Sequence, residues 1–526
     1  MKTTGRVNGI ISNIVIVKAD GPVGQNEICY VWTGDTKMMA EVIKVIGDAA
    51  YVQVFDSTRG LKIGDRVEFE GHMLEVTLAP GLLSRNYDGL QNDLEKMDGL
   101  FIARGSITDP VDYDAEWEFS PLAKAGDKVT ASSWLGEVKE QWVMHKIMVP
   151  FTMTDCYTVK SVAEVGKYKI TDTMAVLTDA EGRDHEVTMV QKWPVKQAVR
   201  CYTEKPRPSR IMETGVRPID TFNPMAEGGT GFIPGPFGAG KTVLQHAISK
   251  QADADVIIMV ACGERANEVV EIFKEFPELI DPHTGHTLME RTIIICNTSN
   301  MPVAAREASV YTGMTIGEYY RSMGLKVLVM ADSTSRWAQA LREMSNRLEE
   351  LPGQDAFPMD LSAIISNFYS RAGLVKLVGG GTGSVTFLGT VAPFNKYIIY
   401  FGQSVFQAAF AFAQQLLRFI KAGFGQGSTV HFPRAPRQVV RFVHQEDIIP
   451  GRFKKSHQMY NRIKQIIVIP NNHIAPQAAV QPQLKGAYRV AFCIFLQGFR
   501  RQAGDIQHIP ESAFDAGIIP VSIGAG

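Results

Sequence analysis

The spacing of apolar and polar residues divides the chain of 526 residues into regions of different character. From residue 1 to about 72, short β-branched runs such as 10–17 alternate with turn signals at Gly60, Gly64-Asp65 and Gly71. Short β-branched runs bounded by glycine turns are typical of antiparallel strands. This region therefore predicts a small β-barrel.

Two further regions follow the predicted barrel. Residues 73–109 have no regular period and include Pro80-Gly81, so we interpret them as a connector. Residues 110–190 return to short strands with turns at Gly126-Asp127 and Gly182, and predict a second, inserted β domain. Its large aromatic residues are assigned to the core rather than to a binding platform: Trp117, Trp134 and Trp142.

Beyond residue 191, wholly apolar runs alternate with stretches of helical period. The apolar runs are 256–261, 292–296, 326–331 and 384–391. Apolar strands separated by helices predict a parallel sheet that is covered on both faces, and ligands of such sheets bind at the carboxyl ends of the strands. The predicted fold class is therefore α/β, with an N-terminal β-barrel and an inserted β domain.

The tail from residue 394 differs in charge and proline content. The chain has a net charge of -1, yet from Phe394 onward 15 Lys+Arg stand against 5 Asp+Glu, so the tail carries about +10 and the rest about -11. Prolines recur between Pro433 and Pro520. A proline inside a helix costs about 3 kcal/mol, so only short helices are expected there.

The six cysteines and the apolar stretches indicate the setting of the protein. The cysteines are scattered without C-x-x-C spacing, which predicts neither a disulfide framework nor a zinc site. No secretory signal pattern opens the sequence, and glutamines interrupt the long uncharged stretch 397–417, which makes it a poor membrane span. We expect a reducing, cytoplasmic setting, with any membrane role arising through partners.

Residues 231–244 carry the strongest candidate chemistry. They match the P-loop pattern G-x-x-x-x-G-K-[ST], with an apolar run before it and helical spacing after it. Backbone N–H groups of such a loop surround a phosphate, its lysine reaches the outer phosphates and its threonine hydroxyl binds Mg²⁺. The alternative, a glycine-rich turn with a chance lysine, is disfavoured by the complete pattern. The predicted nucleotide-contacting residues are Gly235, Pro236, Phe237, Gly238, Ala239, Gly240, Lys241, Thr242 and Val243.

Two polar clusters follow predicted strands. Gly263-Glu264-Arg265 comes directly after the first apolar run, and Glu264 is placed to hold the attacking water of phosphoanhydride hydrolysis. The alternative is a surface carboxylate paired with Arg265. Asp332 ends a later run as a Walker-B-like aspartate, which would hold Mg²⁺ opposite Thr242. Its alternative role is a helix N-cap. For Arg336 we expect a structural ion pair.

Several stretches together carry a family resemblance: Pro80-Gly81-Leu82-Leu83, residues 117–122, 145–150 and 215–221, Gly235-Pro236-Phe237-Gly238, Gly263-Glu264-Arg265 and residues 332–337. In these stretches, over residues 1 to about 393, the chain resembles the catalytic (A-type) subunit of V-type (archaeal and bacterial vacuolar-type) rotary ATPases. The resemblance implies a β-barrel (1–72), a connector (73–109), an inserted bulge domain (110–190) and a RecA-like P-loop nucleotide domain (191–393).

The resemblance also implies an activity and partners. The chain would hydrolyse ATP with Mg²⁺ and couple hydrolysis or synthesis of ATP to proton or sodium transport, with Lys241, Glu264 and Arg265 as catalytic residues and Thr242 and Asp332 as metal ligands. In a hexamer at the cytoplasmic face of a membrane, it would alternate with the non-catalytic (B-type) subunit. There it would bind central and peripheral stalk subunits and contact the membrane sector only indirectly.

Residues 394–526 depart from the family, in which the nucleotide domain continues and an acidic, helical C-terminal domain follows. A shifted reading frame or a mis-assembled gene would explain the abrupt change, and we favour this interpretation. We therefore expect the tail to be frame-shifted or disordered. The alternative is a basic extension of a RecA-like hexameric, nucleic-acid-dependent ATPase. On the favoured interpretation, no nucleic acid is expected as a partner.

Overall fold

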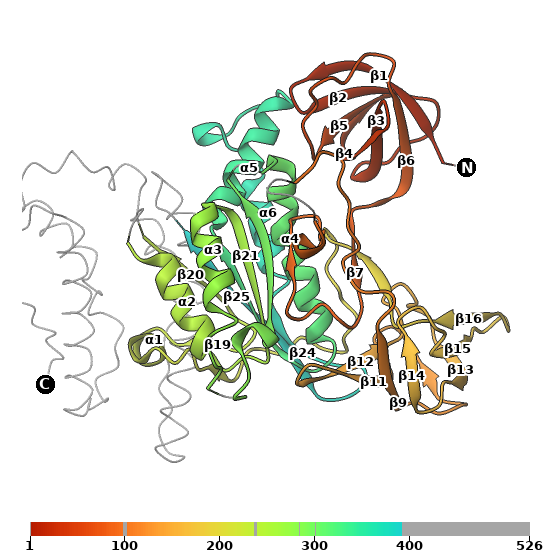
Figure 1. The fold of residues 1–526 in the computed structure, drawn as a ribbon, viewed down its shortest axis with the longest axis vertical. Helices are drawn as coiled ribbons and strands as arrows, with labels where there is room; N and C mark the ends of the chain where they lie inside the picture. Colours follow the sequence, from red (N-terminus) through yellow and green to blue (C-terminus); the bar gives the residue numbers. More distant parts are fainter. Residues whose placement is uncertain (1, 98–101, 236–238, 283, 300, 392–526) are drawn as a thin grey trace, which may run out of the picture. The chain divides into compact units, whose positions relative to one another are not determined.

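The computed structural model describes residues 2–97, 102–235, 239–282, 284–299 and 301–391 (Figure 1). The predictions for the tail from residue 394 and for Pro236, Phe237 and Gly238 of the phosphate loop lie outside these residues. Within them, no helix is both long and apolar enough to cross a membrane.

The first strands form the predicted barrel. They close in the order β1-β2-β5-β4-β3-β6, with β6 pairing back onto β1, and all of these pairs are antiparallel. Alternate side chains such as Val15, Val17, Val52 and Val54 fill the interior, as the period of two requires. The strands are β1 (Thr4–Ile11), β2 (Ile14–Ala19), β3 (Glu27–Thr33), β4 (Thr36–Ile46), β5 (Ala49–Val54) and β6 (Arg66–Met73).

The inserted region forms two four-stranded antiparallel sheets, in the orders β10-β13-β15-β16 and β12-β11-β9-β14. Strand β7 (Glu75–Leu78), at the start of the connector, pairs with β17 (Gln191–Pro194), which directly follows the inserted region. Trp117, Trp134 and Trp142 pack against the largest core cluster, as expected. The strands are β9 (Glu116–Pro121), β10 (Lys128–Val129), β11 (Trp134–Glu140), β12 (Val143–Met148), β13 (Tyr157–Val162), β14 (Gly166–Lys169), β15 (Ala175–Thr178) and β16 (Asp184–Val187).

The rest of the described chain is built on a parallel sheet in the order β20-β25-β23-β21-β22-β8, and β24 pairs antiparallel with β25. The four predicted apolar runs are all strands of this sheet, and each extends one to three residues beyond its predicted limits. The strands are β8 (Asn86–Tyr87), β20 (Thr230–Pro234), β21 (Val256–Glu264), β22 (Thr292–Thr298), β23 (Lys326–Asp332), β24 (Gly373–Lys376) and β25 (Thr382–Val391); β18 (Ile211–Met212) and β19 (Met225–Ala226) form a separate pair.

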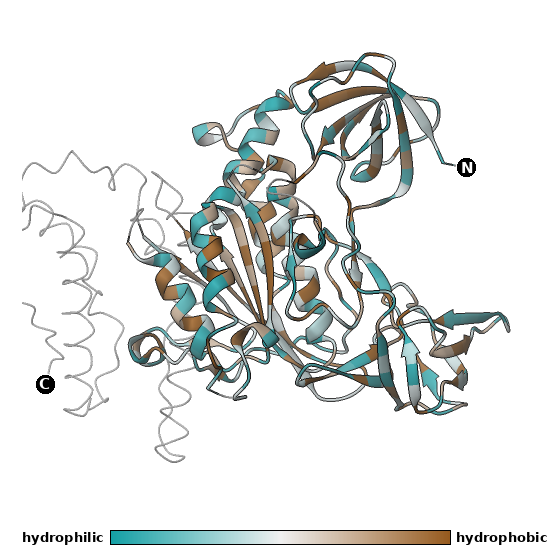
Figure 2. Cartoon of the chain, in the orientation of Figure 1, coloured by the Kyte–Doolittle hydropathy of each residue, from teal (hydrophilic) through white to brown (hydrophobic). Residues whose placement is uncertain are grey.

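Helices cover both faces of this sheet. Ile257 and Met259 of β21 pack in one cluster with residues of α2 and α3, whereas Ile258 and Val260 pack in another with residues of α4 and α5. Figure 2 shows the apolar character of the central strands that this double covering requires. The helices are α1 (Arg217–Phe222), α2 (Lys241–Gln251), α3 (Ala266–Glu275), α4 (Val303–Arg321), α5 (Thr334–Arg347) and α6 (Leu361–Tyr369), with short 3₁₀ turns at Leu94–Lys96, Leu288–Arg291 and Gln354–Ala356.

Helix α4 is buried almost all round, with every residue from 304 to 321 except Tyr311 buried. Gly313 lets it approach the sheet, because a Cβ there would lie 2.5 Å from Val260. Its outer side is covered by the connector, where Thr312 donates to the Gly89 carbonyl at 3.1 Å, and by the inserted domain, where the Trp134 indole donates to the Ser322 carbonyl at 3.1 Å. The helix therefore joins the sheet to two other regions of the chain.

Candidate active site

The phosphate loop lies between a strand and a helix, as predicted. Strand β20 leads into it, and α2 begins at Lys241. Gly240 precedes the helix with a left-handed φ of +82°, a conformation that favours glycine. Gly235 donates its N–H to the Val391 carbonyl at 3.0 Å, and a Cβ on Gly235 would lie 3.1 Å from Ala239 and 3.4 Å from the Lys241 stem. Gly235, the first residue of the pattern, is thus anchored to β25. Val243, two residues into the helix, is 72% exposed.

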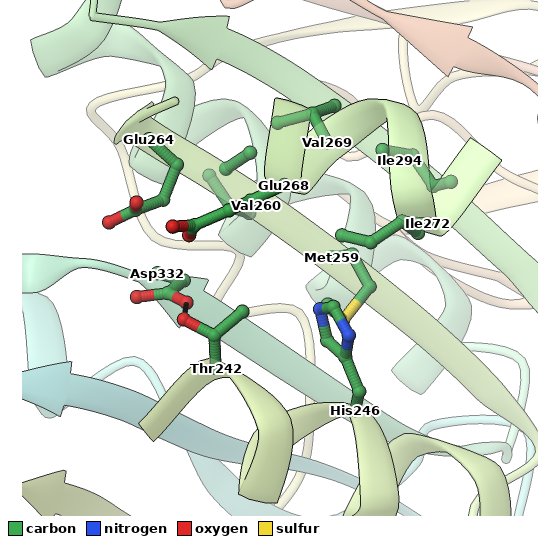
Figure 3. A pocket seen from close by; sticks show the side chains of 11 residues that line it. Thr242, His246, Met259, Val260, Glu264, Glu268, Val269, Ile272, Ile294 and Asp332 are labelled. Carbon is green, nitrogen blue, oxygen red and sulfur yellow. Dashed lines mark hydrogen bonds between the residues drawn. The ribbon is translucent and has the colours of Figure 1, made fainter. Parts of the chain in front are cut away.

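Asp332 lies at the carboxyl end of β23, beside the end of β21, because Ala261 and Asp332 are register partners in the parallel sheet. The Thr242 hydroxyl donates to Oδ2 of Asp332 at 2.6 Å (Figure 3). Asp332 is not the N-cap of α5, because the helix begins at Thr334 and Ser333 holds the N-cap position. The sheet thus brings the two predicted metal ligands together.

Glu264 is the last residue of β21 and follows a bulge at Gly263, whose φ is +74°. A Cβ on Gly263 would lie 2.9 Å from the Arg336 side chain. The Glu264 carboxylate is buried and lies 3.5 Å from Nε of Arg336. The expected ion pair of Arg336 is therefore confirmed, with Glu264 as its partner. Arg265, the N-cap residue of α3, has an exposed side chain.

The surroundings of Glu264 disfavour its charged form. Burial, the charge of Asp332 and a hydrogen bond with the carboxyl of Glu268 raise the pKa of Glu264 to about 7, against the opposing effect of Arg336. A carboxyl group with a pKa near neutrality exchanges protons readily at physiological pH, which suits a general base. Sequence position alone predicts no such shift.

A cavity connects these residues (Figure 3). In the figure the carboxylates of Glu264, Glu268 and Asp332 project into the same space above Thr242. Its polar lining comes from Thr242, His246, Glu264, Glu268 and Asp332, and its apolar lining from Met259, Val260, Ala261, Val269, Ile272 and Ile294. The predicted catalytic residues Lys241 and Arg265 are not among the residues that line this cavity.

Sequence analysis missed two polar residues of this cavity. His246 follows Thr242 by four residues on α2, so helical spacing was an available signal for it, whereas Glu264 ends β21 and Glu268 lies on α3, so no single period links these two. Burial lowers the pKa of His246. Thr390 was also missed, although its hydroxyl donates to Oδ1 of Asp332 at 2.5 Å. The sequence offered no signal for this contact, because it depends on β25 lying beside β23.

The oxygen atoms around Asp332 fit a magnesium ion. Mg²⁺ prefers hydroxyl, carboxylate, water and phosphate oxygens, and usually binds one or two carboxylates together with a substrate phosphate. Thr242 and Asp332 supply a hydroxyl and a carboxylate oxygen 2.6 Å apart, next to the loop that would hold the phosphates. Among the described residues no cluster of three His, Cys, Asp or Glu side chains could hold a metal alone.

Three family models match the chain in order. Residues 7–71 match the beta-barrel domain of the ATP synthase alpha/beta family, and residues 108–196 match the barrel-sandwich domain of the ATP synthase alpha/beta subunit. Residues 215–398 match the nucleotide-binding domain of the ATP synthase alpha/beta family. These matches agree with the barrel, the inserted sheets and the parallel sheet of the structure.

Curated relatives give the same result. The V-type ATP synthase alpha chain of Treponema denticola is 55% identical over 395 residues, which are 74% of this chain and 67% of the relative. The alpha chain 1 of Treponema pallidum is 54% identical over 396 residues, 74% of this chain and 67% of the relative. The alpha chain of Borrelia garinii subsp. bavariensis is 53% identical over 396 residues, 75% of this chain and 69% of the relative. The predicted resemblance is confirmed, and the chain belongs to the family of V-type ATP synthase alpha chains.

Proposed function

We propose that this chain is the ATP-hydrolysing component of a V-type rotary ATPase, which couples hydrolysis or synthesis of ATP to transport of protons or sodium ions. The observation that carries the proposal is the meeting of Thr242, Asp332 and Glu264 at the carboxyl ends of parallel strands, next to a phosphate loop. Ligands of such sheets bind at this edge.

The chemistry assigns a role to each side chain. Lys241 would neutralise charge on the outer phosphates, and Thr242 and Asp332 would hold Mg²⁺, which when bound neutralises charge that develops on the transferred phosphoryl group. Glu264 would accept a hydrogen bond from the attacking water and hold it in line, and Arg336, 3.5 Å away, would keep that carboxylate in place. Arg265 directly follows Glu264, so we retain it as a catalytic residue, and a further arginine would come from a neighbouring protein of the complex.

Family membership places the chain in a multi-subunit complex. We propose that its neighbour in an alternating hexamer is the non-catalytic (B-type) subunit, that the central and peripheral stalks are further partners, and that it lies peripherally at the cytoplasmic face of the membrane. We also propose 1–72, 73–109, 110–190 and 191–393 as the domain boundaries. The reported matches give no support to the nucleic-acid-dependent alternative.

The test is the Lys241→Ala variant in the assembled complex. Loss of the P-loop ammonium should reduce ATP turnover to less than about a tenth, a barrier increase above about 1.4 kcal/mol. Lys250→Ala is the matched control, because Lys250 lies on the same helix but pairs with Glu275 at 2.9 Å, away from the loop. Its turnover should stay within about twofold of wild type. Turnover above about a tenth in Lys241→Ala would remove that lysine from its role.

A further inference from the structure

Both carboxylate oxygens of Asp332 accept a hydrogen bond from a threonine. Thr242, at the start of α2, donates to Oδ2, and Thr390, on β25, donates to Oδ1. Asp332 is 6% exposed and Thr390 is fully buried. The two threonines therefore hold the carboxylate from two different elements.

The two contacts differ in what substrate binding would change. The Thr242 hydroxyl is itself a proposed metal ligand. Binding of a metal ion would therefore change its hydrogen bond with Oδ2 of Asp332. Thr390 meets the other oxygen and lines no part of the cavity in the described residues. The Thr390 contact is thus the one that can persist with and without a bound metal ion.

Thr390 is itself held in position. The Thr334 hydroxyl, in the first turn of α5, donates to the Thr390 carbonyl at 2.8 Å. The preceding Gly389 allows this approach, because a Cβ there would lie 2.8 Å from the Thr334 methyl group. A β-branched side chain on a paired strand also has few rotamers. The hydroxyl therefore has a fixed position from which to orient Asp332.

The same two strands are tied to the phosphate-loop helix. Gln245 of α2 is buried, and its amide donates to the Ala331 carbonyl at 3.3 Å and to the Leu388 carbonyl at 3.0 Å. Ala331 precedes Asp332 on β23, and Leu388 lies two residues before Thr390 on β25. The spacing between Thr242, Asp332 and Thr390 is consequently fixed by the backbone as well as by the hydroxyl groups.

We propose that Thr390 is a positioning residue for the magnesium site: its hydroxyl orients the Asp332 carboxylate so that Oδ2 faces Thr242, the other residue that would hold the metal. Groups that hydrogen-bond to a metal ligand commonly change metal affinity by about 10- to 100-fold when they are removed. The inference rests on the proposed function, because it assumes that Thr242 and Asp332 hold Mg²⁺.

The experiment titrates the full chain with trinitrophenyl-ATP at increasing Mg²⁺ and, separately, in EDTA. In Thr390→Val the Mg²⁺ concentration for half-maximal enhancement of binding should rise about tenfold or more, whereas binding in EDTA should match wild type. Thr390→Ser keeps the hydroxyl and should restore the wild-type requirement to within about threefold. Thr390→Ala serves if the valine variant does not fold.

Thr386→Val is the matched control on the same strand. Thr386 is as buried as Thr390, but its hydroxyl accepts from the Gly228 N–H at 2.9 Å instead of contacting Asp332. Equal Mg²⁺ requirements in the Thr386 and Thr390 valine variants would overturn the inference while leaving the proposed function in place. A wild-type chain that binds the nucleotide equally in Mg²⁺ and EDTA would instead overturn the proposed metal site.

Discussion

Two buried glutamates of this chain have opposite surroundings. Glu140, in the inserted domain, is 1% exposed and accepts hydrogen bonds from the Gly81 N–H at 2.6 Å, the Leu83 N–H at 3.1 Å and the Tyr320 hydroxyl at 3.1 Å. His145 lies 2.6 Å away, and its other ring nitrogen is 2.8 Å from the Tyr319 hydroxyl. The group joins the inserted domain, the connector and α4.

The active-site glutamate has different neighbours. Glu264 is 8% exposed and has Arg336 at 3.5 Å, while two other carboxyl groups, Asp332 and Glu268, lie close enough to act on it. Its pKa rises to about 7 through burial and these neighbours. Burial alone would also raise the pKa of Glu140, but His145 and the Leu83 and Gly81 N–H groups outweigh it and lower that pKa.

The more deeply buried carboxyl is therefore the more acidic one. Depth of burial does not decide the protonation state, because neighbouring charges and hydrogen bonds act in either direction. Glu140, whose hydrogen bonds are satisfied, holds the inserted domain, the connector and α4 together. A carboxyl surrounded by like charges beside a cavity is poised to exchange a proton, which is typical of catalytic sites.

The largest expected effect is on turnover. Glu264→Gln keeps the shape of the side chain but removes the proton-accepting carboxylate, so turnover should fall by about 10²- to 10⁴-fold while nucleotide binding is retained. ATPase assays of the complex and a nucleotide fluorescence titration measure the two quantities separately. Glu271→Gln, an exposed position on α3, is the control and should stay within about twofold. Parallel loss of binding and turnover would make Glu264 structural.

The second effect is on stability. Glu140→Gln removes the charge opposite His145 and should lower the free energy of unfolding by about 3–5 kcal/mol, the cost of breaking a buried pair. Glu137→Gln is the control on the same strand, because Glu137 is partly exposed and pairs with Lys146, so about 1 kcal/mol or less is expected. Denaturant titrations followed by tryptophan fluorescence compare them. If both variants shift the transition equally, the Glu140 cluster contributes no special stability.

The smallest effect is a difference in pH dependence. The pKa of Glu264 rises on folding from 4.5 to about 7, so the folded state binds the extra proton and its stability contribution declines as the pH rises through this window. The pKa of Glu140 falls below 4.5, so its contribution is present above 4.5 and is lost as the pH falls through the folded value.

The free energies of unfolding of wild type and of each glutamine variant, measured from about pH 4 to 8, test this prediction. At each pH the value for the variant is subtracted from the value for wild type. The difference for Glu264 should decrease from acid to neutral pH, and the difference for Glu140 should increase from acid pH to a plateau. If both differences in the free energy of unfolding rose, or both fell, with increasing pH, the contrast between Glu264 and Glu140 would be contradicted.

Much of the fold was determined by the sequence itself. Strand periodicity and glycine turns depend on neighbouring residues, so the barrel, the inserted strands and the four apolar strands of the sheet were all predicted. The P-loop pattern located Lys241 and Thr242, and the ends of apolar runs located Glu264 and Asp332, because parallel strands end at a common edge.

Only the tertiary structure decided which groups touch across elements. The strand order β20-β25-β23-β21-β22 is not the order in the sequence, so nothing local indicated that Thr390 would meet Asp332 or that Arg336 would pair with Glu264. Local pattern predicted the inserted domain, but it did not indicate that Phe119, Val138 and Ile147 of that domain pack in the same core as α4. Burial and pKa depend on such long-range packing, and local periodicity carries no information about it.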